Sequence, residues 1–488
     1  MIKEILMNTK LHINQADNYK KNFGISFRSS TIFYFKKSKT FNTIVNFMDY
    51  WKIKKSINVM IIASLRDLKG KLIFRERVSF DKGPVINYTP KIEEDSFEGS
   101  LEMEAIANDD LGIPYAAMLV LYEAEKSITM VHGYTRTYSP HEIEEKKIIE
   151  FGEEAGLVCR DTNDIRSFII GHNGISIKEE QLAKLWVSNI KGETIEKEIK
   201  IKQLNPFETF KIYPRDHIDN LIKFLDGEDG NVAISYKLSG GFTRTVVGNE
   251  TIDGSEFQVY HSNFNYGRHD PGYMDKKEIG YYSFPFSSQH EKQTTHVDSF
   301  CAEGKYEIYS NENVIKFSSG FRKNIPMEGE VLSVKRIDGD FPKRLNIVLS
   351  AFLKGSKCKL PMESARGFYH SERPPKYRMW MSAGLGKKYR SKLIIHALTD
   401  LYGPLGDNTL TLKLFRDSTF EVIEKKISSR ELKKYEDGVY VDEIFPDQAN
   451  MLENEICQIW GESSSYGGLQ AYTTIENIYG SASIEHNY

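Results

Sequence analysis

The residues best suited to chemistry gather between positions 261 and 298, where four histidines and three aspartates occur close together. Imidazoles and carboxylates are common ligands of zinc, iron and copper, and catalytic sites often combine two or three histidines with one carboxylate. The sequence therefore allows a site for a divalent transition metal. Its candidate ligands are His261, His269, Asp270, His290 and His296.

The spacing of these residues does not identify a known metal motif. His290 and Glu291 are not followed by the second histidine of a His-Glu-x-x-His helix, and no closely spaced ligand pair anchors the set. Polar loop histidines that hydrogen-bond to the backbone or to each other would leave the same pattern, and we favour that interpretation. A metal-dependent enzyme is therefore the alternative hypothesis for this chain.

Histidines also recur along the chain at a nearly constant distance from strand-like stretches. Stretches that end at residues 106, 236, 349 and 460 are each followed, 21 to 26 residues later, by a histidine. The four histidines are His132, His261, His370 and His486. Self-similarity at a fixed period indicates a tandem array of structural repeats.

The recurring histidines have two interpretations. As binding sites, each would pair with a tyrosine and offer an aromatic face and a polar edge to a sugar or a chain-like ligand. The candidate ligand-binding residues are His132, Tyr134, His261, Tyr266, His486 and Tyr488. As structural residues, they would fasten loops at strand ends, as a tyrosine corner does in other sandwiches. We favour fastening, because a feature needed to build every module must recur, whereas binding sites are few per protein.

Short apolar runs with period two predict strands, as at residues 57–62 and 72–80. Glycine-containing turns separate them, for example at 68–70, 226–227 and 338–339. This pattern predicts an all-β fold of tandem β-sandwich modules, immunoglobulin-like in outline, with few short helices. The Cys, Trp and Cys spacing of true immunoglobulin domains is missing.

The repeats suggest a basic N-terminal arm or edge strands at 1–45 and four modules at 46–141, 142–275, 276–373 and 374–488. Helices are expected at 139–149 and 429–435, and short helical crossovers are expected before the strands near residues 234 and 459. Gly384 to Lys388 could cradle a phosphate, but without a following helix a basic hairpin turn is favoured.

The net charge of −3 conceals a basic start, because residues 1–55 hold eleven Lys and Arg against three Asp and Glu. Basic and aromatic residues alternate there as they would on a nucleic-acid surface. An edge strand guarded by lysines explains the same pattern, so we do not expect nucleic acid as a partner.

The four cysteines are far apart, so no zinc-type pair is expected and only a Cys301–Cys358 bridge is worth testing. No secretory core or run of about 18 apolar residues occurs, so we expect no transmembrane segment and a cytoplasmic location. Particle association and signal-less export stay open. The favoured function is a non-enzymatic binding or structural protein that contacts carbohydrate or a protein, or that assembles with itself.

Overall fold

The computed structural model describes residues 27–112, 118–133, 135–137, 153–189, 191, 193–236, 241–243, 245–261, 263–264, 281–285, 294–300, 304–310, 313–318, 325–327, 331–339, 346–352, 357–358, 360–363, 375–451, 454–464, 466–479 and 482–486. Within these residues the strands form four successive β-sandwiches. The structure therefore confirms the predicted all-β fold built from several sandwich modules.

Each sandwich has eight principal strands. The first contains β1 (Arg28–Lys37), β2 (Asn42–Met48), β3 (Met60–Asp67), β4 (Leu72–Val78), β5 (Val85–Tyr88), β6 (Phe97–Ile106), β7 (Leu119–Glu123) and β8 (Ile128–His132), with helix α3 (Tyr50–Lys55) and the short strand β9 (Thr135–Thr137). The second contains β10 (Glu153–Cys159), β11 (Ile165–His172), β12 (Gln181–Ser188), β13 (Thr194–Ile201), β14 (Thr209–Ile212), β15 (Gly230–Ser235), β17 (Val246–Thr251) and β18 (Phe257–His261), with β19 (Asn263–Phe264), η3 (Pro214–Asp216) and α4 (Leu221–Leu225). The short strand β16 (Gly241–Thr243) follows β15 along the chain but pairs with β9 in the sheet of the first sandwich.

The other two sandwiches follow the same plan. The third contains β20 (Tyr281–Pro285), β21 (Thr294–Phe300), β22 (Gly304–Ser310), β23 (Asn313–Ser318), β24 (Ile325–Met327), β25 (Val331–Gly339), β26 (Asn346–Phe352) and β27 (Leu360–Glu363). The fourth contains β28 (Tyr377–Gly386), β30 (Lys392–Ala397), β31 (Thr409–Phe415), β32 (Ile423–Ser428), β33 (Val439–Tyr440), β34 (Asn454–Ser463), β35 (Leu469–Asn477) and β36 (Ala482–His486), with β29 (Tyr389–Arg390), α6 (Thr399–Tyr402), α7 (Ser429–Leu432), η4 (Lys433–Tyr435), α8 (Val441–Ile444) and α9 (Pro446–Met451).

One strand order recurs in all four sandwiches. In the first sandwich, the order is β1-β6-β3-β4 in one sheet, called here the first sheet, and β5-β2-β7-β8 in the other, called the second sheet. The corresponding strands of the other sandwiches pair in the same order, and neighbours within a sandwich are antiparallel. The repeat inferred from the sequence is thus a repeat of complete topology.

Alternating burial shows why these segments form sheets. In β12, Ala183 and Leu185 are buried while Leu182 and Lys184 are exposed, so one face lies on the core and the other meets water. The predicted turn at 226–227 adopts positive φ at both residues, as a tight turn requires. The expected crossovers are present as α4 and α9, and the helix expected at 429–435 is α7 followed by η4.

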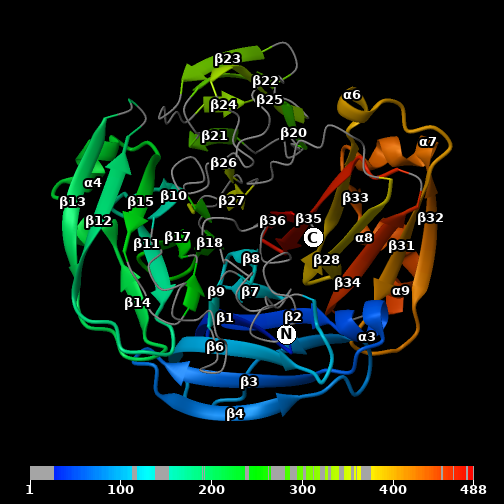
Figure 1. Cartoon of the computed structure of the whole chain (residues 1–488), viewed down its shortest axis with the longest axis horizontal. Coiled ribbons are helices and arrows are strands. Elements are labelled where there is room, and N and C mark those ends of the chain that lie inside the picture. Colours follow the sequence, from blue (N-terminus) through cyan, green and yellow to red (C-terminus); the bar gives the residue numbers. More distant parts are fainter. Residues whose placement is uncertain are drawn as a thin grey trace, which may run out of the picture.

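The four sandwiches are arranged around a common centre (Figure 1). The first sheet of each contacts the second sheet of the next: β10 meets β21 and β26, and β20 meets β30 and β35. The fourth sandwich closes the ring, since β34 contacts β2 and β5 of the first. Contacts between different faces of successive units are heterologous, and here they close after four units.

Two details differ from the sequence interpretation. Residues 28–37 do not form a guarded edge strand: β1 pairs with β6 on one side and with β9 on the other, and β2 pairs with β5 and β7. The buried Phe33 and Phe35 hold β1 in the core. Asp338 and Gly339 are the last residues of β25 and do not form a hairpin tip. The helix expected at 139–149 lies outside the described residues, and the module boundaries stay predictions.

Candidate functional site

Three of the recurring histidines end strands that meet at the centre of the ring. β8, β18 and β36 each end at a histidine and lie together in the middle of Figure 1. Ser127 donates its hydroxyl to the Phe257 carbonyl, and Thr129 donates to the Val259 carbonyl, each at 3.0 Å. Because both partners advance by two residues, β8 and β18 run in the same direction. We call these three strands the central hub.

The fourth sandwich joins the hub from the other side of β8. Ser483 Oγ accepts the Met130 amide at 3.0 Å and donates to the Met130 carbonyl at 3.3 Å. β36 also forms a parallel bridge to β27 of the third sandwich, where Met362 lies opposite Ile484. A side chain from one eighth strand therefore fastens to the backbone of the next, and the ring closes through the same type of contact.

His132 and His261 meet where their strands end. Their ring centroids are 4.0 Å apart and the rings are nearly perpendicular, at 81°. His132 Nδ1 lies 3.0 Å from Glu485 Oε1, and all three side chains are buried. A buried carboxylate that accepts the imidazole N–H fixes the ring orientation. Side chains from the first, second and fourth sandwiches are thus locked together at one point.

The remaining predicted site residues are not assembled into a site by the described part of the chain. His296 lies in β21 opposite Pro326 and Ser350, and His486 is the last residue of β36. Among the described residues, no group of three or more His, Cys, Asp or Glu side chains is placed to hold a metal ion. The other predicted residues lie outside the described segments: Tyr134, Tyr266, His269, Asp270, His290, His370 and Tyr488.

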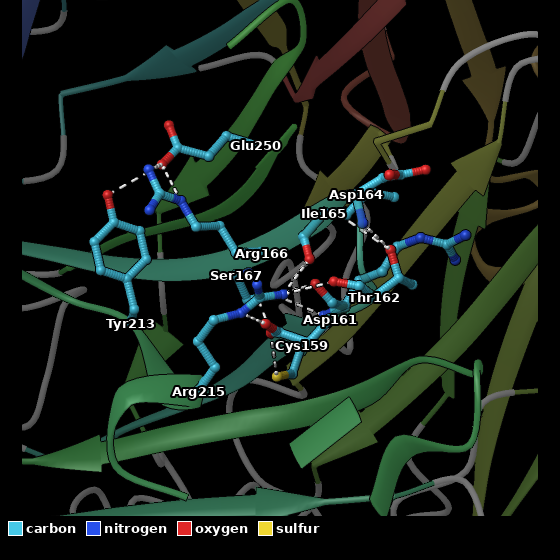
Figure 2. Close-up of polar contacts among 11 residues, drawn as sticks. Cys159, Asp161, Thr162, Asp164, Ile165, Arg166, Ser167, Tyr213, Arg215 and Glu250 are labelled. Atoms are coloured by element: carbon cyan, nitrogen blue, oxygen red, sulfur yellow. Dashed lines mark hydrogen bonds and ion pairs between the residues drawn. The ribbon is translucent and has the colours of Figure 1, made fainter. Parts of the chain in front are cut away.

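An ion cluster that sequence reasoning missed lies between the first and second sandwiches. Figure 2 shows Arg166 against Glu250, with the Tyr213 hydroxyl donating to the same carboxylate at 3.1 Å. Lys211 Nζ reaches Glu250 at 3.3 Å. Burial disfavours the Glu250 carboxylate, but Lys211 and Arg166 hold its pKa below the usual value. The charge is stable only because both cations face it.

Lys211 connects this ion cluster of the second sandwich to the first sandwich. Its ammonium lies 4.8 Å from the Phe168 ring centre and 5.8 Å from that of Tyr34 in the first sandwich. Burial lowers the pKa of Lys211, and Glu250 opposes that effect. Phe257 completes the aromatic interface, stacked on Phe168 at 5.0 Å. These contacts fasten the interface between the first and second sandwiches.

A second buried carboxylate orders the turn between β10 and β11. Asp161 accepts Arg215 Nε at 2.5 Å and the Ser167 amide at 3.1 Å, while Arg215 also donates to the Thr162 carbonyl (Figure 2). Burial raises the pKa of Asp161 against the opposing effect of Arg215. The neighbouring Cys159 thiol is fully buried and burial raises its pKa, which makes it unreactive. Cys301 lies outside the described residues, so its bridge to Cys358 stays untested.

The seam between the fourth and first sandwiches combines an apolar cluster with a buried polar network. Gln458 donates to Ser382 at 2.8 Å, and both side chains hydrogen-bond to Asn46. Asn87 donates to the Ile456 carbonyl at 2.9 Å. Asn46, Ser382 and Gln458 are almost completely buried. Gln458 Oε1 has no hydrogen-bond partner among the described residues, but the bonds that join Asn46, Ser382 and Gln458 favour one pairing of the two surfaces.

The basic stretch at 384–388 belongs to this seam. β28 ends at Gly386, and the hairpin that follows brings Lys388 Nζ within 2.6 Å of Glu123, at the end of β7. The Tyr389 hydroxyl donates to the same carboxylate at 2.9 Å. The hairpin thus binds the fourth sandwich to the first. These contacts explain the glycine and lysine pattern without a bound phosphate.

A repeated turn could have located the hub from the sequence. Ile-Asp-Gly-Ser at 252–255, Leu-Lys-Gly-Ser at 353–356 and Ile-Tyr-Gly-Ser at 478–481 each precede an eighth strand. No comparable signal exists for Glu250 or Asp161, which are single acids in ordinary strand and turn contexts. Neither a model of a known family nor a curated protein sequence matches the chain. Within the described residues, no helix is long and apolar enough to cross a membrane.

Proposed function

We propose that this protein acts without catalysis, as a structural or binding protein whose four sandwiches form one closed ring. The observation that carries the proposal is the engagement of His132. This recurring histidine is buried, hydrogen-bonded to Glu485 of the fourth sandwich and in ring contact with His261 of the second. A residue committed to three-way fastening is not available to a substrate.

The other polar clusters support the same conclusion. Glu250, Asp161 and Asn46 all belong to buried networks within or between sandwiches. Such networks specify how modules fit together, and catalytic groups need access to solvent or substrate. The partners we propose for the ring are a carbohydrate, a protein or further copies of the chain, contacted through surface loops and side chains.

Two measurements on the full chain test this proposal. Small-angle scattering should give the radius of a compact ring, and Glu485→Gln should lower the unfolding temperature, because it removes the charge that holds His132. The matched control is Glu196→Gln, a half-exposed acid on β13, which should have little effect.

Elemental analysis of the purified protein distinguishes this proposal from the alternative hypothesis of a metal-dependent enzyme. Near-stoichiometric zinc, iron or copper in the purified protein, lost in a His261→Ala and His269→Ala double variant, would replace our proposal with the enzyme. An extended particle in scattering would refute the closed ring itself.

A further inference from the structure

Two sheet edges at the rim of the ring have no neighbouring strand in the part of the chain that the structure describes. β4 is the last strand of the first sheet in the first sandwich, and β13 holds the same position in the second sandwich. Both lie at the outer margin of Figure 1, β4 at the bottom and β13 at the left. An exposed edge strand presents backbone amides and carbonyls that can pair with another chain. The two edges are therefore candidate contact surfaces.

The charges of the two edges are complementary when the strands run antiparallel. Charged residues of alternating sign stand at the centre of each strand: Arg75, Glu76 and Arg77 in β4, and Glu196, Lys197 and Glu198 in β13. An antiparallel pairing with Glu76 opposite Lys197 places an opposite charge against each of these residues. The next pairs on either side are apolar, with Phe74 opposite Ile199 and Val78 opposite Ile195. Charge and polarity therefore agree over the whole length of this pairing.

The same register also matches the two faces of each sheet. Phe74 and Val78 pack towards the core of the first sandwich, and Ile195 and Ile199 pack towards that of the second. Side chains alternate between the two faces along a strand, so the central pair of Glu76 and its partner lies on the inner face. The flanking charged pairs lie on the outer face. The apolar interiors of two sandwiches would thus continue across the joint.

The directions of the backbone groups agree with this register as well. In both hairpins the amide before the turn, from Asp67 or Asn189, donates across the turn at 3.0 Å. These directions alternate along a strand. Counted from the two turns through the β3–β4 and β12–β13 pairings, the amides of Arg75 and Arg77 in β4 and of Glu198 in β13 are directed away from their own sheets. The register sets Arg75 opposite Glu198, as a closely bonded antiparallel pair requires.

Each charged pair contains one residue that has no ion pair in the described part of the chain. These residues are Arg77, Lys197 and Glu198. The other members already have contacts: Arg75 with Glu104, Glu76 with the Tyr88 hydroxyl, and Glu196 with Lys184. An exposed charge without a counter-ion attracts an opposite charge from another molecule. Both edges therefore carry charges that a second strand can neutralise.

We propose that the β4 edge of one copy of this protein pairs with the β13 edge of a second copy, in antiparallel order with Glu76 opposite Lys197. Two identical edges do not match, because a register centred on their charged residues sets like charges opposite each other. The two edges belong to different sandwiches, so the contact is heterologous and each ring offers both halves of it. Such contacts join rings into an open series. The inference rests on the structural role proposed above and assigns its partner, a further copy of the chain.

β32 of the fourth sandwich is an alternative partner for β4. It is also an edge strand among the described residues, and it carries Glu424, Lys425 and Lys426. With Lys425 opposite Glu76, the apolar residues of the two strands again share a face. This register sets Lys426 opposite Arg75, however, which is a like-charged pair. β13 avoids that repulsion and is the better match.

The test is sedimentation velocity of the full chain between about 1 and 100 µM. At about 50 mM salt we expect the mean mass to rise with concentration without stopping at a dimer, and about 500 mM salt should weaken association, because it screens the ion pairs. Glu76→Lys and Lys197→Glu each set like charges opposite each other, and each should weaken association about tenfold or more. An equal mixture of the two variants presents opposite charges at every junction and should associate as the wild type does.

The mixture also controls for misfolding, because two damaged proteins would not recover when combined. Lys425→Glu is the matched control: it makes the same change at an exposed lysine of β32 and should leave association unchanged. Glu198→Pro removes an outward amide while the bonds to β12 stay in place, and it should weaken association if the strands pair through their backbones.

The mass of a single chain at every concentration would overturn the proposed contact. So would an equal mixture that fails to recover, undiminished association of Glu198→Pro, or loss of association in Lys425→Glu in place of Lys197→Glu. These outcomes leave the closed ring and its non-catalytic role standing. That proposal fails separately, through the scattering and elemental analysis described above.

Discussion

Acid should weaken the fold through one buried histidine in particular. His172 is fully enclosed at the end of β11, where Nδ1 lies 2.9 Å from Thr209 Oγ1, and burial lowers its pKa to about 3. The unfolded chain binds this proton near pH 6.5. Between these values the unfolded state holds more protons than the folded state, so stability falls as the pH falls.

The size of the effect follows from the two pKa values. From pH 7.5 to pH 5 the unfolded His172 becomes almost fully charged while the folded residue stays neutral. This difference removes about 2 kcal/mol from the free energy of unfolding. Continued acidification to pH 3 should bring the loss to about 4 to 5 kcal/mol. His172→Asn keeps a polar partner for Thr209 but cannot titrate, and it should lack this loss.

The measurement is urea unfolding of the wild type and His172→Asn at pH 7.5 and pH 5. We expect the variant to lose about 2 kcal/mol less than the wild type between the two conditions. His217→Asn, a partly exposed histidine of the same sandwich, serves as the control and should follow the wild type. Equal losses in the wild type and in His172→Asn would refute the assignment of the pH dependence to burial of His172.

Two further substitutions test the joints between sandwiches. Glu250→Gln leaves Lys211 and Arg166 without their shared carboxylate and should cost about 3 kcal/mol, measured by urea unfolding at pH 7.5; a cost below that of the exposed Glu196→Gln would contradict the role given to this cluster. Asn46→Ala removes the hydrogen-bond partner of Ser382 and Gln458 and should cost about 1 to 3 kcal/mol. Calorimetry should show this loss of unfolding free energy for Asn46→Ala, and no loss for Asn58→Ala on the exposed loop after α3.

Periodicity predicted much of the architecture, because alternating burial on a strand depends on the strand alone. The strand expected at 72–80, which is β4, and the helical segment expected at 429–435 were therefore recognisable from their own residues. Pairing across the ring was not, since it depends on residues far apart: His132 and Glu485 are 353 positions apart. Neither the sequence around His132 nor the sequence around Glu485 indicates that the two residues pair.

The charged N-terminal segment was misleading for a related reason. Lysines that flank Phe33 and Phe35 resemble an exposed edge, but β1 is covered by β6 along its whole length and by β9 at Ile32. The covering strand begins 60 residues later. Similarly, the sequence does not predict the ring contact between His132 and His261, which depends on the closed ring, and their role as fasteners stays a prediction.

The polar network in the closing seam has a consequence during synthesis. Asn87 and the Ile456 carbonyl to which it donates are 369 positions apart in the sequence, whereas Thr129 and Val259 are only 130 positions apart. If the ribosome adds about 5 to 20 residues per second, roughly 20 to 70 s pass between synthesis of the first sandwich and synthesis of the fourth-sandwich strand that covers it. An entirely apolar surface exposed to solvent for that long would favour aggregation. Asn46 and Asn87 present amides that water can solvate in the meantime, beside the apolar side chains that the fourth sandwich later covers.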